Sequence, residues 1–412
     1  MKAGIPIYRD TPKEPQQWGF FAAKNFIFTL LFYIIITMIK LILFTLILFF
    51  ISMGSAQAIY DPLSVNNNKI GIHILFPEEL STSAELINSS GGDWGYVTIP
   101  IQAGDKDIVK WQNFMDEARN LHVIPILRLA TEGDYFDKTT WRKPKFEDVL
   151  DFANFLDSLD WPVKNRYIIV FNEVNRADEW NGAANPAEYA QILNYANEVF
   201  KSKNDDYFII SSGMDNAAST GNGTYSQYDY FLLMNEGVYG IFDRIDGFSS
   251  HAYPNPGFSQ LPTTDTPRSI YSFLYEIRTI NSLTNKKLPI FITETGWDQS
   301  LSSDNTVGGY FTQAFEGAWN NENIVAITPF LLNSGPGPFE KFSLLSSDGN
   351  RNEIFNKIKA FKKTQGSPVL NEMKLSNITQ NSNLPVKRFA YNPMQEDGIH
   401  LKFFVKWLLF PL

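Results

Sequence analysis

The stretch that decides the fold class is Tyr167–Glu173, which reads YIIVFNE. Its first five residues are apolar without polar alternation, which is typical of a strand in a parallel sheet covered on both faces. The apolar run then stops at an asparagine and a glutamate. A second stretch, residues 289–294, repeats the pattern as PIFITE. Together the two stretches predict buried parallel strands that present polar groups at their carboxyl ends.

Similar apolar runs extend this pattern over most of the chain, at residues 69–75, 95–99, 123–129, 207–211, 245–249 and 324–330. Amphipathic segments of helical period lie between them, at residues 107–121, 146–159, 186–200, 269–283, 309–319 and 353–361. A doubly wound open sheet is the alternative, but it needs a glycine-rich turn after its first strand, where residues 75–79 read LFPEE. About eight strand-plus-helix units instead predict an α/β fold, a (β/α)8 TIM barrel.

The composition excludes several classes of protein. The 412 residues carry a formal net charge of -9, and no cluster of Lys and Arg offers a nucleic acid its phosphate contacts. There is no cysteine, which excludes disulfides, thiolate metal sites and a cysteine nucleophile. We therefore expect no nucleic-acid partner.

The N-terminal region predicts that the chain is exported. Residues 20–51 are almost entirely apolar and exceed the roughly 20 residues that cross a bilayer. Inside them, a basic start at Lys40, an apolar core at 41–52 and Ala56-Gln57-Ala58 follow the layout of a secretory signal peptide. An uncleaved signal anchor is the alternative, and both place the barrel outside the cytoplasm, secreted or membrane-anchored. The predicted domains are 1–58 (signal peptide or anchor, the only membrane contact), 59–365 (barrel) and 366–412 (a linker-like tail of unknown role).

Barrel enzymes assemble their active sites at the carboxyl ends of the strands. The side chains expected there are Arg128, Asn172, Glu173, His251, Tyr253 and Glu294. Two carboxylates on opposite sides of a barrel mouth suit glycosidic bond cleavage, in which one is protonated and the other ionised. Arg128 and Tyr253 are expected to keep Glu294 ionised, which makes Glu173 the proton donor. Trp180 and Trp297 offer flat faces to sugar rings, with core packing as the alternative.

These motifs resemble those of the clan A glycoside hydrolases, the retaining "4/7" superfamily, over roughly residues 65–365. Asn172-Glu173 and Glu294 match the acid/base and nucleophile positions, and His251-x-Tyr253 matches the strand-six motif that contacts the nucleophile. The resemblance is closest to cellulase-like and β-xylosidase-like members, and implies that Asn172 contacts the sugar 2-hydroxyl. The chain departs from the clan in having Val174 for the usual proline, no arginine on strand two, and PFLLN at 329–333 in place of a strand-eight tryptophan.

The sequence thus predicts a retaining O-glycosidase that acts on extracellular poly- or oligosaccharides without a cofactor. No second His or Asp stands at metal-ligand spacing, so no metal site is expected. A catalytically silent carbohydrate-binding barrel at the cell surface is the main alternative, and a structural envelope protein is another. The presence of both glutamates weighs against the silent barrel, because a pure binder needs no acid and nucleophile at matching strand ends. The polar residues at the ends of four separate strands weigh against the structural protein.

Overall fold

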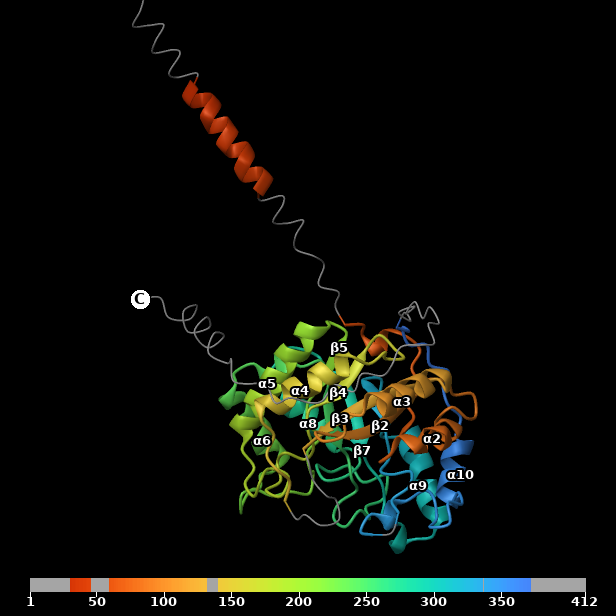
Figure 1. Cartoon of the computed structure of the whole chain (residues 1–412). Coiled ribbons are helices and arrows are strands. Elements are labelled where there is room, and N and C mark those ends of the chain that lie inside the picture. Colours follow the sequence, from red (N-terminus) through yellow and green to blue (C-terminus); the bar gives the residue numbers. More distant parts are fainter. Residues whose placement is uncertain (1–29, 46–58, 132–139, 336, 372–412) are drawn as a thin grey trace, which may run out of the picture. The chain divides into compact units, whose positions relative to one another are not determined.

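The computed structural model describes residues 30–45, 59–131, 140–335 and 337–371, and it alternates strands with helices (Figure 1). The strands are β1 (Gly71–His73), β2 (Gly95–Gln102), β3 (Val123–Ala130), β4 (Arg166–Ile169), β5 (Tyr207–Ile210), β6 (Phe248–His251), β7 (Ile290–Glu294) and β8 (Ile324–Ile327). The α-helices around them are α2 (Leu80–Ile87), α3 (Ile108–Asn120), α4 (Phe146–Asp157), α5 (Pro186–Lys203), α6 (Gln227–Gly237), α7 (Ile241–Arg244), α8 (Ser272–Asn281), α9 (Asp304–Glu316) and α10 (Glu353–Ala360).

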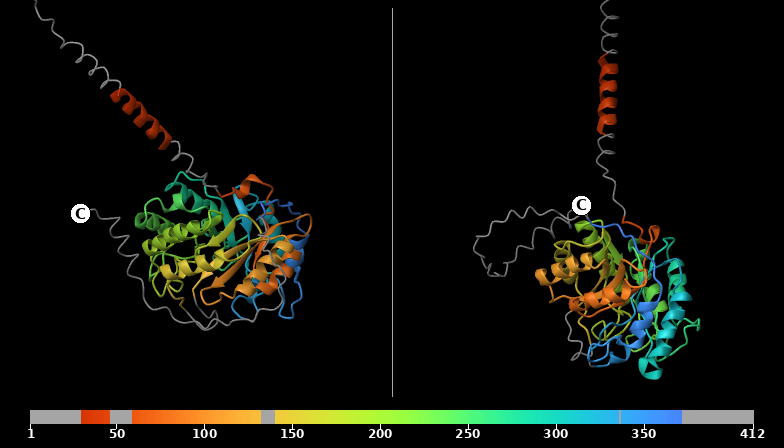
Figure 2. Two further views of the ribbon diagram at one scale, coloured as in Figure 1. Left: turned by 45° about the horizontal axis from the view of Figure 1, so that its top comes forward. Right: turned by 90° about the vertical axis from the view of Figure 1, so that its right-hand side faces the viewer.

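All strand pairs are parallel, and the strands close into a ring. Strands β1 to β5 form one sheet and β6 to β8 another. Single bridges between Ile210 and Gly247 and between Ile70 and Ile327 join the edges of the two sheets. The helices lie outside the strands in every view (Figure 2). This architecture confirms the predicted α/β barrel.

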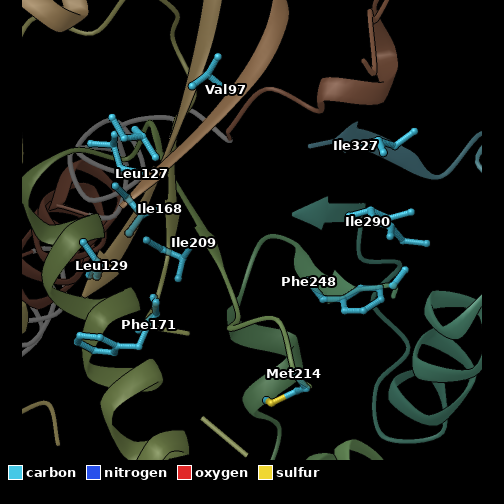
Figure 3. Close-up of a cluster of buried hydrophobic side chains, with 14 of the residues drawn as sticks. Val97, Leu127, Leu129, Ile168, Phe171, Ile209, Met214, Phe248, Ile290 and Ile327 are labelled. Carbon is cyan, nitrogen blue, oxygen red and sulfur yellow. The ribbon is translucent and has the colours of Figure 1, made fainter. Parts of the chain in front are cut away.

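Two separate cores explain why the strands are apolar along their whole length. Successive residues of a strand point to opposite faces, so each strand feeds both cores. Ile168 and Val170 pack outward against the helices, in the core that Figure 3 shows in part with Leu127 and Ile209. Tyr167 points into the barrel, where its ring centroid lies 5.0 Å from that of Phe208 and 5.6 Å from that of Phe291. Aromatic rings from β4, β5 and β7 therefore fill the barrel interior.

The helices differ from the expectation in number more than in position. The six expected segments overlap α3, α4, α5, α8, α9 and α10, whereas α2, α6 and α7 were missed. Helix α9 begins at Asp304, five residues before the expected start, because the Ser303 side chain caps it by accepting a hydrogen bond from the Thr306 amide. Helix α2 carries two serines and a threonine, which weaken its helical signal, but Leu80, Leu86 and Ile87 are buried.

The two ends of the chain are described only in part. Residues 30–45 form a helix, and no helix in the described parts of the chain combines the length and apolar character that a membrane span requires. The predicted cleavage site at 56–58 lies outside the described residues. Of the predicted tail, residues 366–371 are hydrogen-bonded to the barrel domain, from the Gly366 amide to the Asp93 carbonyl (2.9 Å) and from the Lys164 amide to the Val369 carbonyl (2.8 Å).

The closure of the barrel can be tested by a mutation at Gly71. It lies in β1 at the seam between the two sheets, and a Cβ atom there would lie 2.5 Å from the Tyr96 carbonyl oxygen and 2.7 Å from Thr328 Cγ2. We expect Gly71→Ala to lower the free energy of unfolding by about 1–3 kcal/mol in urea denaturation. Gly309→Ala in α9 is the control, because its Cβ meets no atom within 4 Å. It should raise stability by up to about 1 kcal/mol. Equal effects of the two changes would contradict the closed seam.

Candidate active site

The carboxyl ends of the strands surround a cleft of about 510 Å³, a size typical of small-molecule sites. Every strand contributes to it through a residue at its end or in the loop that follows: Leu75, Gln102, Arg128, Glu173, Asp215, Tyr253, Glu294 and Phe330. A hollow of about 20 Å³ near the opposite ends of the strands is lined by Tyr96 and Tyr167 among others, and none of its described lining residues is a carboxylate. The cleft is therefore the candidate active site.

Glu294, the last residue of β7, is buried at 6% exposure, and its carboxylate is held by one group from β3 and one from the segment just after β6. Arg128 Nη1 donates to Oε1 at 2.5 Å, and the Tyr253 hydroxyl donates to Oε2 at 3.0 Å. Burial alone would raise the pKa of this carboxyl. The positive charges of His251 and Arg128 outweigh burial and lower the pKa well below its usual range. Glu294 is therefore ionised at neutral pH.

Glu173 follows β4 on a strained backbone. Its φ of 37° and that of Phe171, 66°, lie in the left-handed region, which non-glycine residues seldom occupy. The Glu173 amide donates to the Gly213 carbonyl at 3.0 Å, which ties this turn to the loop after β5. The turn brings the Glu173 carboxylate to the cleft wall.

His251 lies between the two glutamates and is buried. Its Nδ1 is 3.0 Å from Glu173 Oε1 and 3.7 Å from Glu294 Oε2. Burial opposes protonation of the imidazole, but the charge of Glu294 and the hydrogen bond with Glu173 raise its pKa. The resemblance of the His251-x-Tyr253 motif implied a contact between this segment and the nucleophile, whereas the shorter contact of His251 is with Glu173.

An oxygen of Glu173, an oxygen of Glu294 and a nitrogen of His251 all lie within 4.8 Å of one another. Three such ligand atoms also satisfy the simplest requirement for binding a metal ion. The Arg128 guanidinium on Glu294 opposes a second cation at that carboxylate. The absence of a metal therefore stays a prediction, and the pair of carboxylates is the notable feature of the site.

Several charged side chains surround Glu173 that were not predicted from the sequence. Arg176 forms ion pairs with Asp178 at 2.6 Å, Glu173 at 3.4 Å and Asp215 at 3.6 Å. Burial and the nearby charge of Glu173 raise the pKa of Glu179 to about 8, and the same two causes raise that of Asp215. All of these side chains line the cleft. Their only signal in the sequence is that they follow the ends of β4 and β5.

Three of the predicted substrate-binding residues line the cleft: Arg128, Asn172 and Tyr253. The Asn172 side-chain oxygen accepts a hydrogen bond from Arg128 Nη1 at 2.7 Å, so one guanidinium orders both Asn172 and Glu294. His251 is close to both glutamates, but it is not among the residues that line the cleft. The geometry gives His251 a supporting position beneath the carboxylates.

The prediction that Trp180 and Trp297 form sugar platforms was wrong. Both are 2% exposed and belong to the hydrophobic core. Trp297 stacks edge-on against Phe311 at 5.0 Å between ring centroids, and Trp180 donates its ring N–H to Glu188. Packing against helices holds the two indoles away from the cleft, which Trp141 lines instead.

Comparison with known proteins supports the fold. No family model matches the chain, and no curated protein matches its sequence. Solved structures do match. A family 39 glycoside hydrolase from Bacteroides cellulosilyticus has a TM-score of 0.50 and 19% identity over 73% of this chain and 64% of its own, so this chain spans less than two thirds of that protein. A family 39 β-xylosidase from Caulobacter crescentus has a TM-score of 0.50 and 14% identity, covering 71% of this chain and 70% of its own.

A family 5 protein (GH5_18) from Bifidobacterium longum has a TM-score of 0.51 and 10% identity, covering 71% of this chain and 78% of its own. All three are clan A glycoside hydrolases. At these identities the likeness establishes the fold and leaves the activity to be argued from the site. The predicted resemblance to a cellulase-like or xylosidase-like clan A barrel is confirmed at the level of fold.

The burial of Trp297 in the hydrophobic core, away from the cleft, can be tested by mutation. Because its indole is enclosed by the core, we expect Trp297→Ala to lower the free energy of unfolding by about 3–5 kcal/mol. Trp141→Ala, a change at the half-buried cleft wall, should lower it by only about 1 kcal/mol. Denaturant unfolding of both variants measures the difference. An unchanged stability for Trp297→Ala would show that the indole is not a core residue.

Proposed function

We propose that this chain is a retaining glycoside hydrolase that cleaves O-glycosidic bonds of poly- or oligosaccharides by double displacement. The spacing of the two glutamates supports this proposal. Their nearest carboxylate oxygens lie within 4.8 Å. Retaining enzymes have carboxyl groups about 5–5.5 Å apart, whereas inverting enzymes need about 6.5–9.5 Å to admit a water.

In the proposed first step, ionised Glu294 attacks the anomeric carbon, and Glu173 gives its proton to the departing oxygen. The bond between the anomeric carbon and that oxygen breaks as a glycosyl ester on Glu294 forms. Arg128 and Tyr253 hold the Glu294 carboxylate in place by their hydrogen bonds. Asn172, ordered by Arg128, is proposed to contact the sugar 2-hydroxyl.

In the proposed second step, Glu173 takes a proton from water, and the water oxygen attacks the anomeric carbon of the ester. Glu294 leaves as a carboxylate, which Arg128 and Tyr253 stabilise as its charge returns. No cofactor enters either step. A catalytically silent carbohydrate-binding barrel would not need this preorganised pair of carboxylates, and no observation favours that alternative.

Replacing each of the two glutamates by alanine should change the activity in a different way. Glu294→Ala removes the nucleophile, so activity should be lost on every substrate, and added azide should form a glycosyl azide of inverted configuration. Glu173→Ala removes proton donation, which is worth roughly 100- to 10,000-fold for a poor leaving group. It should therefore keep the first step on nitrophenyl glycosides but lose natural substrates, and azide should restore its turnover with retained configuration.

The control for both variants is Glu322→Ala, an exposed glutamate just before β8 and therefore at the opposite ends of the strands. It should leave activity on all substrates unchanged. The two catalytic variants are compared with it by initial rates and by NMR of the azide products. Full activity of either Glu173→Ala or Glu294→Ala on a substrate that the unaltered protein cleaves would contradict the assignment.

We further propose that residues 59–365 act outside the cytoplasm as the catalytic domain, after a signal peptide or anchor at 1–58. The basis is the apolar run at 20–51 and Ala56-Gln57-Ala58. N-terminal sequencing of protein recovered from the medium should give Ile59 first. Intact chain in the membrane fraction would instead establish the anchored form, and intact chain in the cytoplasm would contradict export.

A further inference from the structure

The walls of the cleft differ in chemistry. The wall after β4 and β5 carries Glu173, Arg176 and Asp215. The opposite wall is built by the loops after β1 and β8, and none of its described lining residues is charged. Four phenylalanines of these two loops line the cleft, Phe76, Phe330, Phe339 and Phe342, and we call the first three the aromatic wall.

The inner part of the aromatic wall is a corner formed by two rings. Phe330 is buried next to the catalytic centre, and its amide donates to the Thr295 carbonyl, one residue after Glu294. Its ring meets that of Phe339 at 5.3 Å and 85°. Phe339 is 36% exposed, so the corner presents a free ring surface to the cleft.

The outer part is Phe76, which is 59% exposed. Strands β1 and β8 are neighbours, joined by a hydrogen bond from the His73 amide to the Pro329 carbonyl at 3.0 Å, so Phe76 and Phe339 lie on adjacent loops. The Glu79 carboxylate accepts hydrogen bonds from the amides of Leu75 and Phe76, at 3.1 and 3.0 Å. The exposed ring is thus carried on a fixed backbone.

Exposed aromatic rings held rigidly beside a cleft mark a binding surface, because they would otherwise be left in water without compensation. The position of Glu173 indicates which part of the substrate lies beside the aromatic wall. A proton donor must face the leaving group, and β4 is opposite β8 and β1 in a ring of eight strands. The aromatic wall therefore lies on the side of the sugar that is transferred to Glu294.

We infer that Phe76 and Phe339 bind the transferred part of the substrate as an uncharged chain of more than one sugar, whose C–H faces stack on the two rings. This inference rests on the proposed function and adds the substrate class. A chain of uronic acids is disfavoured, because none of the described residues with which these two loops line the cleft is a cation that could pair with a carboxylate. A single sugar reaches only the catalytic centre and gains nothing from Phe76.

The test compares nitrophenyl glycosides of one sugar with those of longer β-linked oligomers of glucose, mannose or xylose. Phe76→Ala and Phe339→Ala should each lower kcat/KM for the longer glycosides by about fivefold to tenfold. Both should leave kcat/KM for the single-sugar glycoside unchanged. Phe339→Trp should keep activity on the longer glycosides, whereas Phe339→Leu should not, because leucine is apolar but has no flat ring.

Tyr239→Ala is the matched control, since this tyrosine lies between α6 and α7 and is 87% exposed. This variant should leave kcat/KM unchanged for both the single-sugar glycoside and the longer glycosides. Binding of the unmodified oligomers to the Glu173→Gln variant, followed by tryptophan fluorescence with and without Phe339→Ala, gives a readout independent of turnover. The affinity should fall with Phe339→Ala by the same factor as kcat/KM.

The outcomes separate this inference from the proposed function. An active protein whose preference for longer glycosides is unaffected by Phe76→Ala and Phe339→Ala would overturn the inference alone. Oligomer binding that depends on Phe339, without cleavage of any glycoside, would overturn the proposed hydrolase and support the inference. Neither cleavage nor binding of any oligomer would overturn both.

Discussion

The structure depends most on the ion pair between Glu294 and Arg128 at the mouth of the barrel. A buried carboxylate is stable only if its charge is compensated by partners that replace water. Arg128 comes from β3, and His251 and Tyr253 come from β6 and the residues just after it, so the compensation spans both sheets of the ring. A change that opens the barrel would separate Arg128 from Glu294 and leave this charge with fewer partners, which links the stability of the fold to the chemistry of the site.

The interior of the barrel supports this arrangement from below. Tyr167, Phe208 and Phe291 fill the ring with aromatic surface and form the floor under the polar side chains. The strands end above that floor, and the residues at and after their ends line a shared cleft. The two glutamates differ in environment: Glu294 accepts hydrogen bonds from Arg128 and Tyr253, whereas Glu173 lies beside His251 and Arg176, with two further carboxylates nearby.

Much of the fold could be predicted because strands buried on both faces leave an unbroken apolar signal, as at 167–171. The residues at the ends of those strands, Glu173 and Glu294, are placed by the same signal. The loops have no period, so sequence does not tell whether a loop side chain points into the cleft or toward a helix. That is why Trp180 and Trp297 were misplaced, and why Arg176, Glu179 and Phe339 were missed. Packing in three dimensions decides those orientations.

The most direct test of the account is to trap the proposed glycosyl ester. In a 2-deoxy-2-fluoro glycoside, the fluorine slows both the formation and the hydrolysis of the ester. A good leaving group keeps formation faster than hydrolysis, so the ester accumulates. After digestion, mass spectrometry of the labelled peptide should place the fluorosugar on Glu294. A label on Glu173 or on another residue, or release of a product of inverted configuration from the unaltered protein, would contradict the double displacement.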